Sequence, residues 1–127
     1  MGVAFFVVLE RKIDGLDTMM DGKALARHIE FLDALANELR VRPLSEFVSV
    51  NPDEMHDFLE DEGMDTADVE IPPVKYFSAN EGLATVRAIL TSPRLLEHAA
   101  VNDLKECERI LCAAGRCDVR WHFEIDI

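Results

Sequence analysis

The final ten residues of the sequence, DVRWHFEIDI, alternate between polar and apolar side chains. Val119, Trp121, Phe123, Ile125 and Ile127 occupy every second position. Because successive side chains of a β-strand point to opposite faces, this repeat places the five apolar residues on one face and the polar residues on the other. The pattern predicts a half-buried strand over residues 118–127, with Trp121 and Phe123 directed into the core.

A second strand is predicted over residues 3–9, VAFFVVL, where both alternating sets of positions are apolar. A short run of this kind is typical of a strand that is covered on both faces. Its second face, which carries Phe6 and Val8, must therefore meet a helix, a loop or a second subunit. We expect the two strands to pair antiparallel. A homodimer through Phe6 and Val8, or through an edge of the sheet, is one hypothesis for this surface.

The clearest helix is predicted over residues 23–40. Its apolar positions recur with the helical period and form one stripe. The stripe consists of Leu25, Ile29, Leu32, Ala36 and Leu39. Asp21 precedes the helix and is expected to cap its first amides, and Pro43 follows its end.

Capping signals predict further helices between the strands. The expected segments are 51–63, 78–90, 92–99 and 102–115. Asn51 and Asn102 are expected N-caps, and Ser78 with Glu81 forms a capping box. The helices at 51–63 and 102–115 are expected to stop at glycines. Residues 44–50 fit either a helix or a strand, and we expect a short turn followed by extended chain.

The predicted order is therefore a strand, four to five helices and a second strand. A length of 127 residues corresponds to one domain, and 49% apolar residues suffice for a core. We predict a single, mostly helical α+β domain spanning residues 1–127, with a small sheet made from the first and last strands.

The charge of the chain is concentrated in one region. The net charge is −12, and residues 43–74 contain ten acids and no lysine or arginine. Because contacts to phosphate groups require basic side chains, this balance argues against binding of nucleic acid and of anionic membranes. We therefore expect neither nucleic acid nor membrane among the partners.

Within that region, the predicted helix 51–63 stacks carboxylates along one side. Like charges one turn apart destabilise a helix by about 0.2–0.5 kcal/mol per pair. Such a face either keeps the protein soluble or is offset by a cationic partner. We expect a non-enzymatic interaction module that presents the surface from Asp53 to Glu70 to a basic protein. The expected contact residues are Asp53, Asp57, Glu60, Asp61, Glu62 and Asp65.

The alternative hypothesis is a small hydrolase or lyase that uses histidine and carboxylate pairs, with or without a divalent metal. His56 and Glu60 lie one helical turn apart and could chelate an ion, although H-E-x-x-H is absent. His28 falls inside the apolar stripe. His122 and Glu124 share the polar face of the last strand, which we expect to be solvated; in a cleft they would form an acid–base pair.

Other signals are negative. The sequence contains no G-x-S-x-G motif and no glycine-rich phosphate loop. Its three cysteines have the spacing C-x4-C-x4-C, which is not that of a zinc ribbon or a redox motif, so we expect reduced thiols. No signal peptide or membrane span is recognisable. We expect a cytoplasmic protein without a cofactor.

Overall fold

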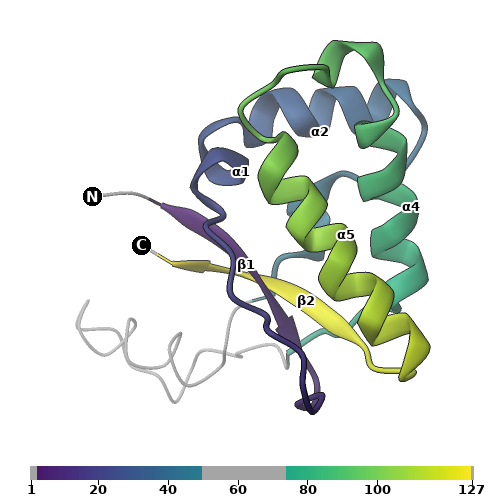
Figure 1. Ribbon diagram of the computed structural model, residues 1–127. Helices are drawn as coiled ribbons and strands as arrows, with labels where there is room; N and C mark the ends of the chain where they lie inside the picture. The colour runs from purple at the N-terminus through teal and green to yellow at the C-terminus, as the bar shows by residue number, and fades with distance from the viewer. Residues whose placement is uncertain (1–2, 50–73, 127) are drawn as a thin grey trace, which may run out of the picture.

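The computed structural model describes residues 3–49 and 74–126, and it confirms the small α+β fold (Figure 1). The helices lie on one side of a two-stranded antiparallel sheet. The elements in chain order are β1 (Ala4–Leu9), α1 (Lys23–Arg27), α2 (Ile29–Glu38), the 3-10 turn η1 (Leu44–Phe47), α4 (Ala79–Leu90), the 3-10 turn η3 (Pro93–Leu95), α5 (Val101–Arg116) and β2 (Trp121–Asp126).

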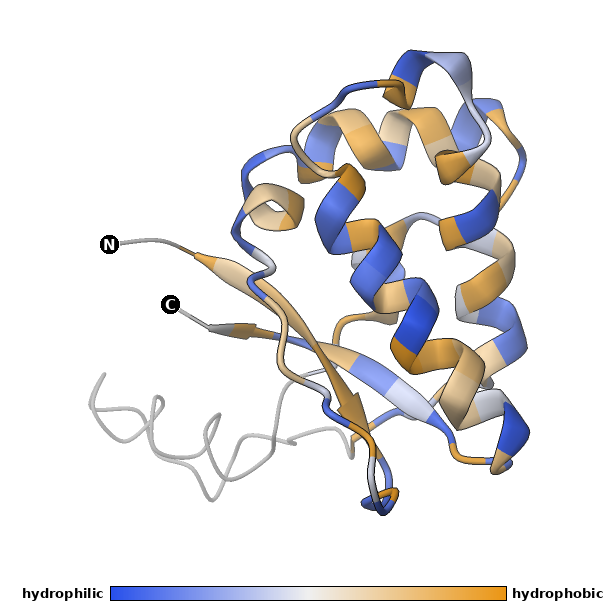
Figure 2. Ribbon diagram, in the orientation of Figure 1, coloured by the Kyte–Doolittle hydropathy of each residue, from blue (hydrophilic) through white to orange (hydrophobic). Residues whose placement is uncertain are grey.

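The first and last strands pair as the sequence predicts. Val7 lies opposite Phe123, and Leu9 lies opposite Trp121. Trp121 and Phe123 are completely buried, and the indole N–H of Trp121 donates a hydrogen bond to the carbonyl of Ser78 at 3.1 Å. Hydropathy colouring shows β1 as apolar along its length, whereas β2 places polar residues between apolar ones (Figure 2).

The second edge of β2 is occupied by two short extended segments. Val48 forms a parallel bridge with Phe123, and Phe77 forms an antiparallel bridge with Trp121. The turn η1 followed by extended chain at Val48 confirms the prediction for this part of the sequence. Within the described residues, β2 therefore has neighbours on both edges, whereas β1 has only β2 along its full length.

The single helix predicted over residues 23–40 is in fact two. His28, with φ −111° and ψ 19°, ends α1 and precedes α2. Backbone hydrogen bonds continue across the break, since the His28 amide donates to Ala24 and the Leu32 amide donates to His28. Of the predicted stripe, Leu25, Leu32 and Ala36 are buried, Ile29 is partly buried and Leu39 is exposed. The helical period therefore predicted most of the buried face, but it predicted neither the exposure of Leu39 nor the break at His28.

The cap predicted at Asp21 is wrong. Gly22 occupies the N-cap position of α1 with φ 70°, and a Cβ atom there would lie 1.7 Å from the carbonyl oxygen of Phe5. The chain passes so close to β1 at this point that only glycine fits. The capping carboxylate comes instead from Asp103 of α5, whose Oδ2 accepts hydrogen bonds from the amides of Ala24 and Leu25 at 3.1 and 3.2 Å.

The predictions for the remaining helices are confirmed only in part. Ser78 caps α4 as predicted, with its Oγ accepting from the Glu81 amide at 3.2 Å. Asn102 does not cap α5; Ala100 is the N-cap residue and has no side-chain bond. The predicted helix 92–99 is reduced to the short turn η3. The predicted helix 51–63 lies outside the described residues.

No helix within the described ranges combines the length and the apolar character that crossing a membrane requires.

Candidate functional site

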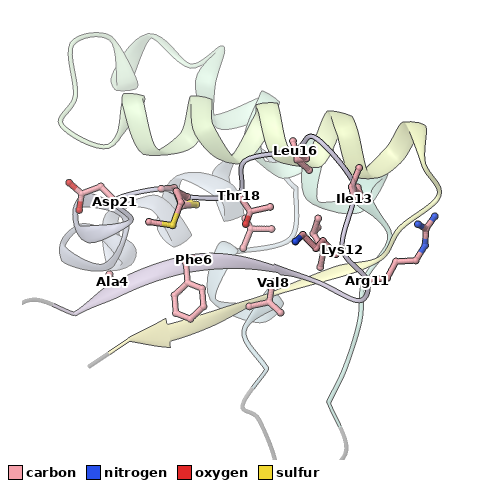
Figure 3. Close-up of a pocket in the computed structure, with 13 residues that line it drawn as sticks. Ala4, Phe6, Val8, Arg11, Lys12, Ile13, Leu16, Thr18 and Asp21 are labelled. Atoms are coloured by element: carbon pink, nitrogen blue, oxygen red, sulfur yellow. The ribbon is translucent and has the colours of Figure 1, made fainter.

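After β1 the chain reverses and runs back beside the same strand. We call residues 10–22 the strap (Figure 3). One end of the strap is tied to β1 by a hydrogen bond of 3.0 Å from the amide of Phe5 to the carbonyl of Gly22. Its middle is held to α5, because the guanidinium of Arg109 donates to the carbonyl of Asp17 at 2.7 Å. These bonds hold the strap at its Gly22 end and at its middle.

Between the strap and β1 lies a pocket of about 650 Å³, which we call the edge groove. This volume falls within the range of about 300–1,000 Å³ that is typical of ligand sites. Leu16 and Met20 of the strap pack against the core and line the groove. The complete lining is Ala4, Phe6, Val7, Val8, Leu9, Arg11, Lys12, Ile13, Leu16, Thr18, Met19, Met20 and Asp21.

The register of the sheet decides which backbone groups face the edge groove. In an antiparallel pair, the N–H and C=O of successive residues point alternately toward and away from the neighbouring strand. The amide of Glu10 bonds to Arg120 beside β2, and the amide of Phe5 bonds to Gly22 on the other side. The peptide groups of Val7 and Leu9 must therefore point away from β2, toward the strap.

Neither Val7 nor Leu9 has a backbone partner on that side within the described part of the chain. Val7 is a core residue with 4% of its surface exposed, and it also lines the edge groove. Buried backbone N–H and C=O groups without partners are rare in proteins, because leaving them unpaired costs free energy. The edge groove therefore presents two donors and two acceptors that an incoming group would satisfy.

These four backbone groups have the spacing at which one strand of a sheet forms hydrogen bonds to its neighbour. Val7 and Leu9 are two residues apart, which is about 6.8 Å along an extended chain. A row of unpaired groups with this repeat is a template for pairing with another extended segment. The geometry is thus suited to binding a polypeptide backbone.

The predicted pair His122 and Glu124 is brought together on the opposite face of β2 from the core. The His122 Nε2 lies 3.9 Å from Glu124 Oε2, and its Nδ1 lies 3.1 Å from the carbonyl oxygen of Phe123. His122 is only 2% exposed, so the prediction that this side chain is solvated is wrong. The ring of Tyr76 packs edge-on against it at 5.1 Å. Neither His122 nor Glu124 lines the edge groove.

The predicted candidate His28 meets a second imidazole. Its ring lies edge-on to His98, with centroids 4.8 Å apart, and His98 stacks on Phe31 at 5.1 Å. Desolvation, followed by the nearby charge of His28, lowers the pKa of His98.

Among the described residues, no three histidine, cysteine or acidic side chains gather closely enough to hold a metal ion.

The remaining predicted site residues lie outside the described ranges. They are the six acids expected to contact a partner, Asp53, Asp57, Glu60, Asp61, Glu62 and Asp65, and the expected metal pair His56 and Glu60. Comparison of the chain with models of protein families, with curated protein sequences and with solved structures finds no match.

Sequence reasoning did not find the edge groove. One signal was available, since Gly15 and Gly22 follow an apolar strand at the spacing of a chain reversal. That signal predicts a turn, but it does not show how far the returning chain stands from the strand.

Proposed function

We propose that this protein is a non-enzymatic interaction module that binds a short extended segment of a partner polypeptide along the free edge of β1. The observation that carries the proposal is the pair of unpartnered peptide units at Val7 and Leu9, which face the edge groove. Addition of a strand to an exposed edge is a common mode of peptide recognition, in which backbone hydrogen bonds supply affinity.

A polypeptide fits this site better than a compact small molecule. The groove offers alternating donors and acceptors from Val7 and Leu9, and another extended backbone carries the same groups at the same spacing. Apolar side chains surround them, including Ile13 and the highly exposed Met19, at 79%. Methionine adapts to varied apolar surfaces, which suits contact with the side chains of a bound segment.

The strap favours a single segment over a second copy of the sheet. It runs beside β1 and is tied to Phe5 through Gly22, so it occupies the space that a second sheet would need. Symmetric pairing of two β1 edges would require this tie to break. The homodimer hypothesis through a sheet edge is therefore less compatible with the edge groove than a short peptide is.

The acidic region supports a second part of the proposal, which rests on the sequence alone. Ten acids without a lysine or arginine between residues 43 and 74 favour a partner with a basic surface. Complementary charge would mainly accelerate and select the association. Reversal of Asp57, Asp61 and Asp65 to lysine should slow association with such a partner and weaken its salt dependence. Rates that are unchanged by both salt and these variants would contradict this part.

The edge groove itself is tested with the peptide Ac-Thr-Val-Thr-Val-Thr-NH2, followed by NMR of the labelled protein. We expect saturable shifts of the Val7 and Leu9 amides and of the Met19 methyl group. The matched control is the same peptide with both valines N-methylated, which removes two backbone donors and should bind much more weakly. Equal binding of the two peptides, or shifts that avoid β1, would contradict the proposal. So would a dimer whose interface contains the β1 edge.

A further inference from the structure

We infer that the segment bound in the edge groove carries a carboxylate at the end beside Leu9. This inference rests on the proposed function and names the chemistry of the partner at the same site. It follows from the distribution of charged side chains along the groove, which is cationic at one end and anionic at the other.

The cationic end is formed by Arg11 and Lys12, which come shortly after the strand and line the groove (Figure 3). The guanidinium of Arg11 donates to the carbonyl of Cys117 at 2.8 Å, which holds it beside the end of β1. A guanidinium has further N–H donors in a fixed plane, so one such bond leaves others for a carboxylate. Lys12 is exposed and has no hydrogen-bond or ion-pair partner among the described residues.

Two acids near this end have other partners, although the charge of Arg11 also acts on Glu10. Glu10 is held by Arg120, with oxygen-to-nitrogen distances of 2.8 and 3.1 Å, and this contact lowers the pKa of Glu10. The carboxylate of Asp17 accepts from the amide of Met19 at 2.9 Å within the strap. Both carboxylates therefore already accept hydrogen bonds from groups of the protein.

The other end of the groove carries the opposite charge. Asp21 lines it next to Gly22, where the strap is tied to β1. Between the two ends, the strap contributes apolar side chains such as Ile13 and Leu16. A carboxylate on the bound segment would be attracted at the Lys12 end and repelled at the Asp21 end, so the charge also selects the orientation of the segment.

The carboxylate has two possible sources, an acidic side chain or the C-terminus of the partner chain. Four probes distinguish them. They are Ac-Thr-Val-Thr-Val-Thr-NH2, its variant with glutamate at the last position, its variant with lysine there, and the neutral peptide with a free C-terminus. Each is titrated against the full-length protein, and affinity is measured from the shift of the Leu9 amide.

We expect at least one of the two carboxylate probes to bind about fivefold more tightly than the lysine probe, which is the upper range for exposed ion pairs. Tight binding of the glutamate probe assigns the carboxylate to a side chain, and tight binding of the free acid assigns it to a C-terminus. The variant Lys12→Glu should reverse the preference. The matched control Lys105→Glu, an exposed lysine on α5 that does not line the edge groove, should leave it unchanged.

Two results separate this inference from the proposed function. If all four probes bind with equal affinity, the carboxylate is not recognised and the inference is wrong, while the edge groove still binds peptides. If none of the probes binds, the proposed function itself is contradicted. A preference that survives Lys12→Glu and Arg11→Glu would also overturn the inference.

Discussion

Trp121 lies so close to Gly82 that no side chain fits between them. A Cβ atom on Gly82 would stand 2.3 Å from Cζ2 of the indole and 2.9 Å from Cδ1 of Leu111. Gly82 is in α4 and Trp121 is in β2, so this contact joins the helical layer to the sheet. The absence of a side chain at Gly82 lets α4 approach the completely buried Trp121.

We therefore expect Gly82→Ala to destabilise the protein. The added methyl group must displace the indole or the helix, and overpacking of this kind costs about 1–3 kcal/mol. Gly115→Ala is the matched control, because its new Cβ atom would meet only the Cβ of Ala79 at an ordinary 3.6 Å. Alanine is the better helix former, so Gly115→Ala should be neutral or stabilising by up to about 1 kcal/mol. Urea unfolding of both variants measures the difference, and equal effects would contradict this packing.

The capping of α1 by Asp103 gives a second prediction. Asp103→Ala leaves the amides of Ala24 and Leu25 without their acceptor, and loss of a cap costs about 1–2 kcal/mol of stability. Asp103→Asn keeps an oxygen acceptor and should lose less. Denaturant midpoints of the two variants provide the test. An alanine variant as stable as the natural protein would show that Asp103 does not hold α1.

The stability of the fold should also fall in mildly acidic solution because of His98. Its Nδ1 accepts a hydrogen bond from the amide of Ala100 at 3.0 Å, which requires an unprotonated nitrogen. The pKa of His98 is lowered from the ordinary value of 6.5, so the unfolded chain binds this proton more readily than the folded chain. Stability contributed by the neutral ring is present above pH 6.5 and is lost as the pH falls through 6.5 toward the folded pKa.

The control for this pH effect is His98→Asn, which offers an oxygen acceptor and does not titrate. The stability advantage of the natural protein over this variant should shrink as the pH falls below 6.5. A constant difference across that range, measured by urea unfolding at each pH, would contradict the role of His98.

The cysteines should differ strongly in reactivity. Burial raises the pKa of the Cys107 thiol far above its ordinary range, and the negative charges of Asp103 and Glu106 raise it further. Cys117 is exposed. Because the thiolate is the reactive form, iodoacetamide should modify Cys117 in the folded protein and reach Cys107 only after unfolding. Peptide mapping by mass spectrometry checks the order, and early alkylation of Cys107 would contradict its burial.

The sequence predicted the features that depend on side-chain patterns. Two-residue alternation placed Trp121 and Phe123 in the core, and the helical period identified the buried positions Leu25 and Leu32. Both patterns report directly which face of an element is apolar. The pairing of the two terminal strands followed, because their apolar faces needed a common core.

Features that depend on the approach of distant segments were not predictable. The cap of α1 comes from Asp103, about eighty residues away in sequence, so the local signal at Asp21 was misleading. The edge groove depends on which peptide groups of β1 face away from β2, and that is set by the register. The apolar residues Val7 and Leu9 gave no sign that their backbone, not their side chains, would form the candidate site.

Amide hydrogen exchange along β1 tests the central claim most directly, because alternate residues of one strand serve as each other's control. In the free protein, the amides of Val7 and Leu9 should exchange faster than those of Phe6 and Val8, which point toward β2. Saturation with the glutamate-containing probe should slow exchange at Val7 and Leu9 and leave Phe6 and Val8 unchanged. Binding of the probe without any change at Val7 and Leu9 would contradict strand addition at this edge.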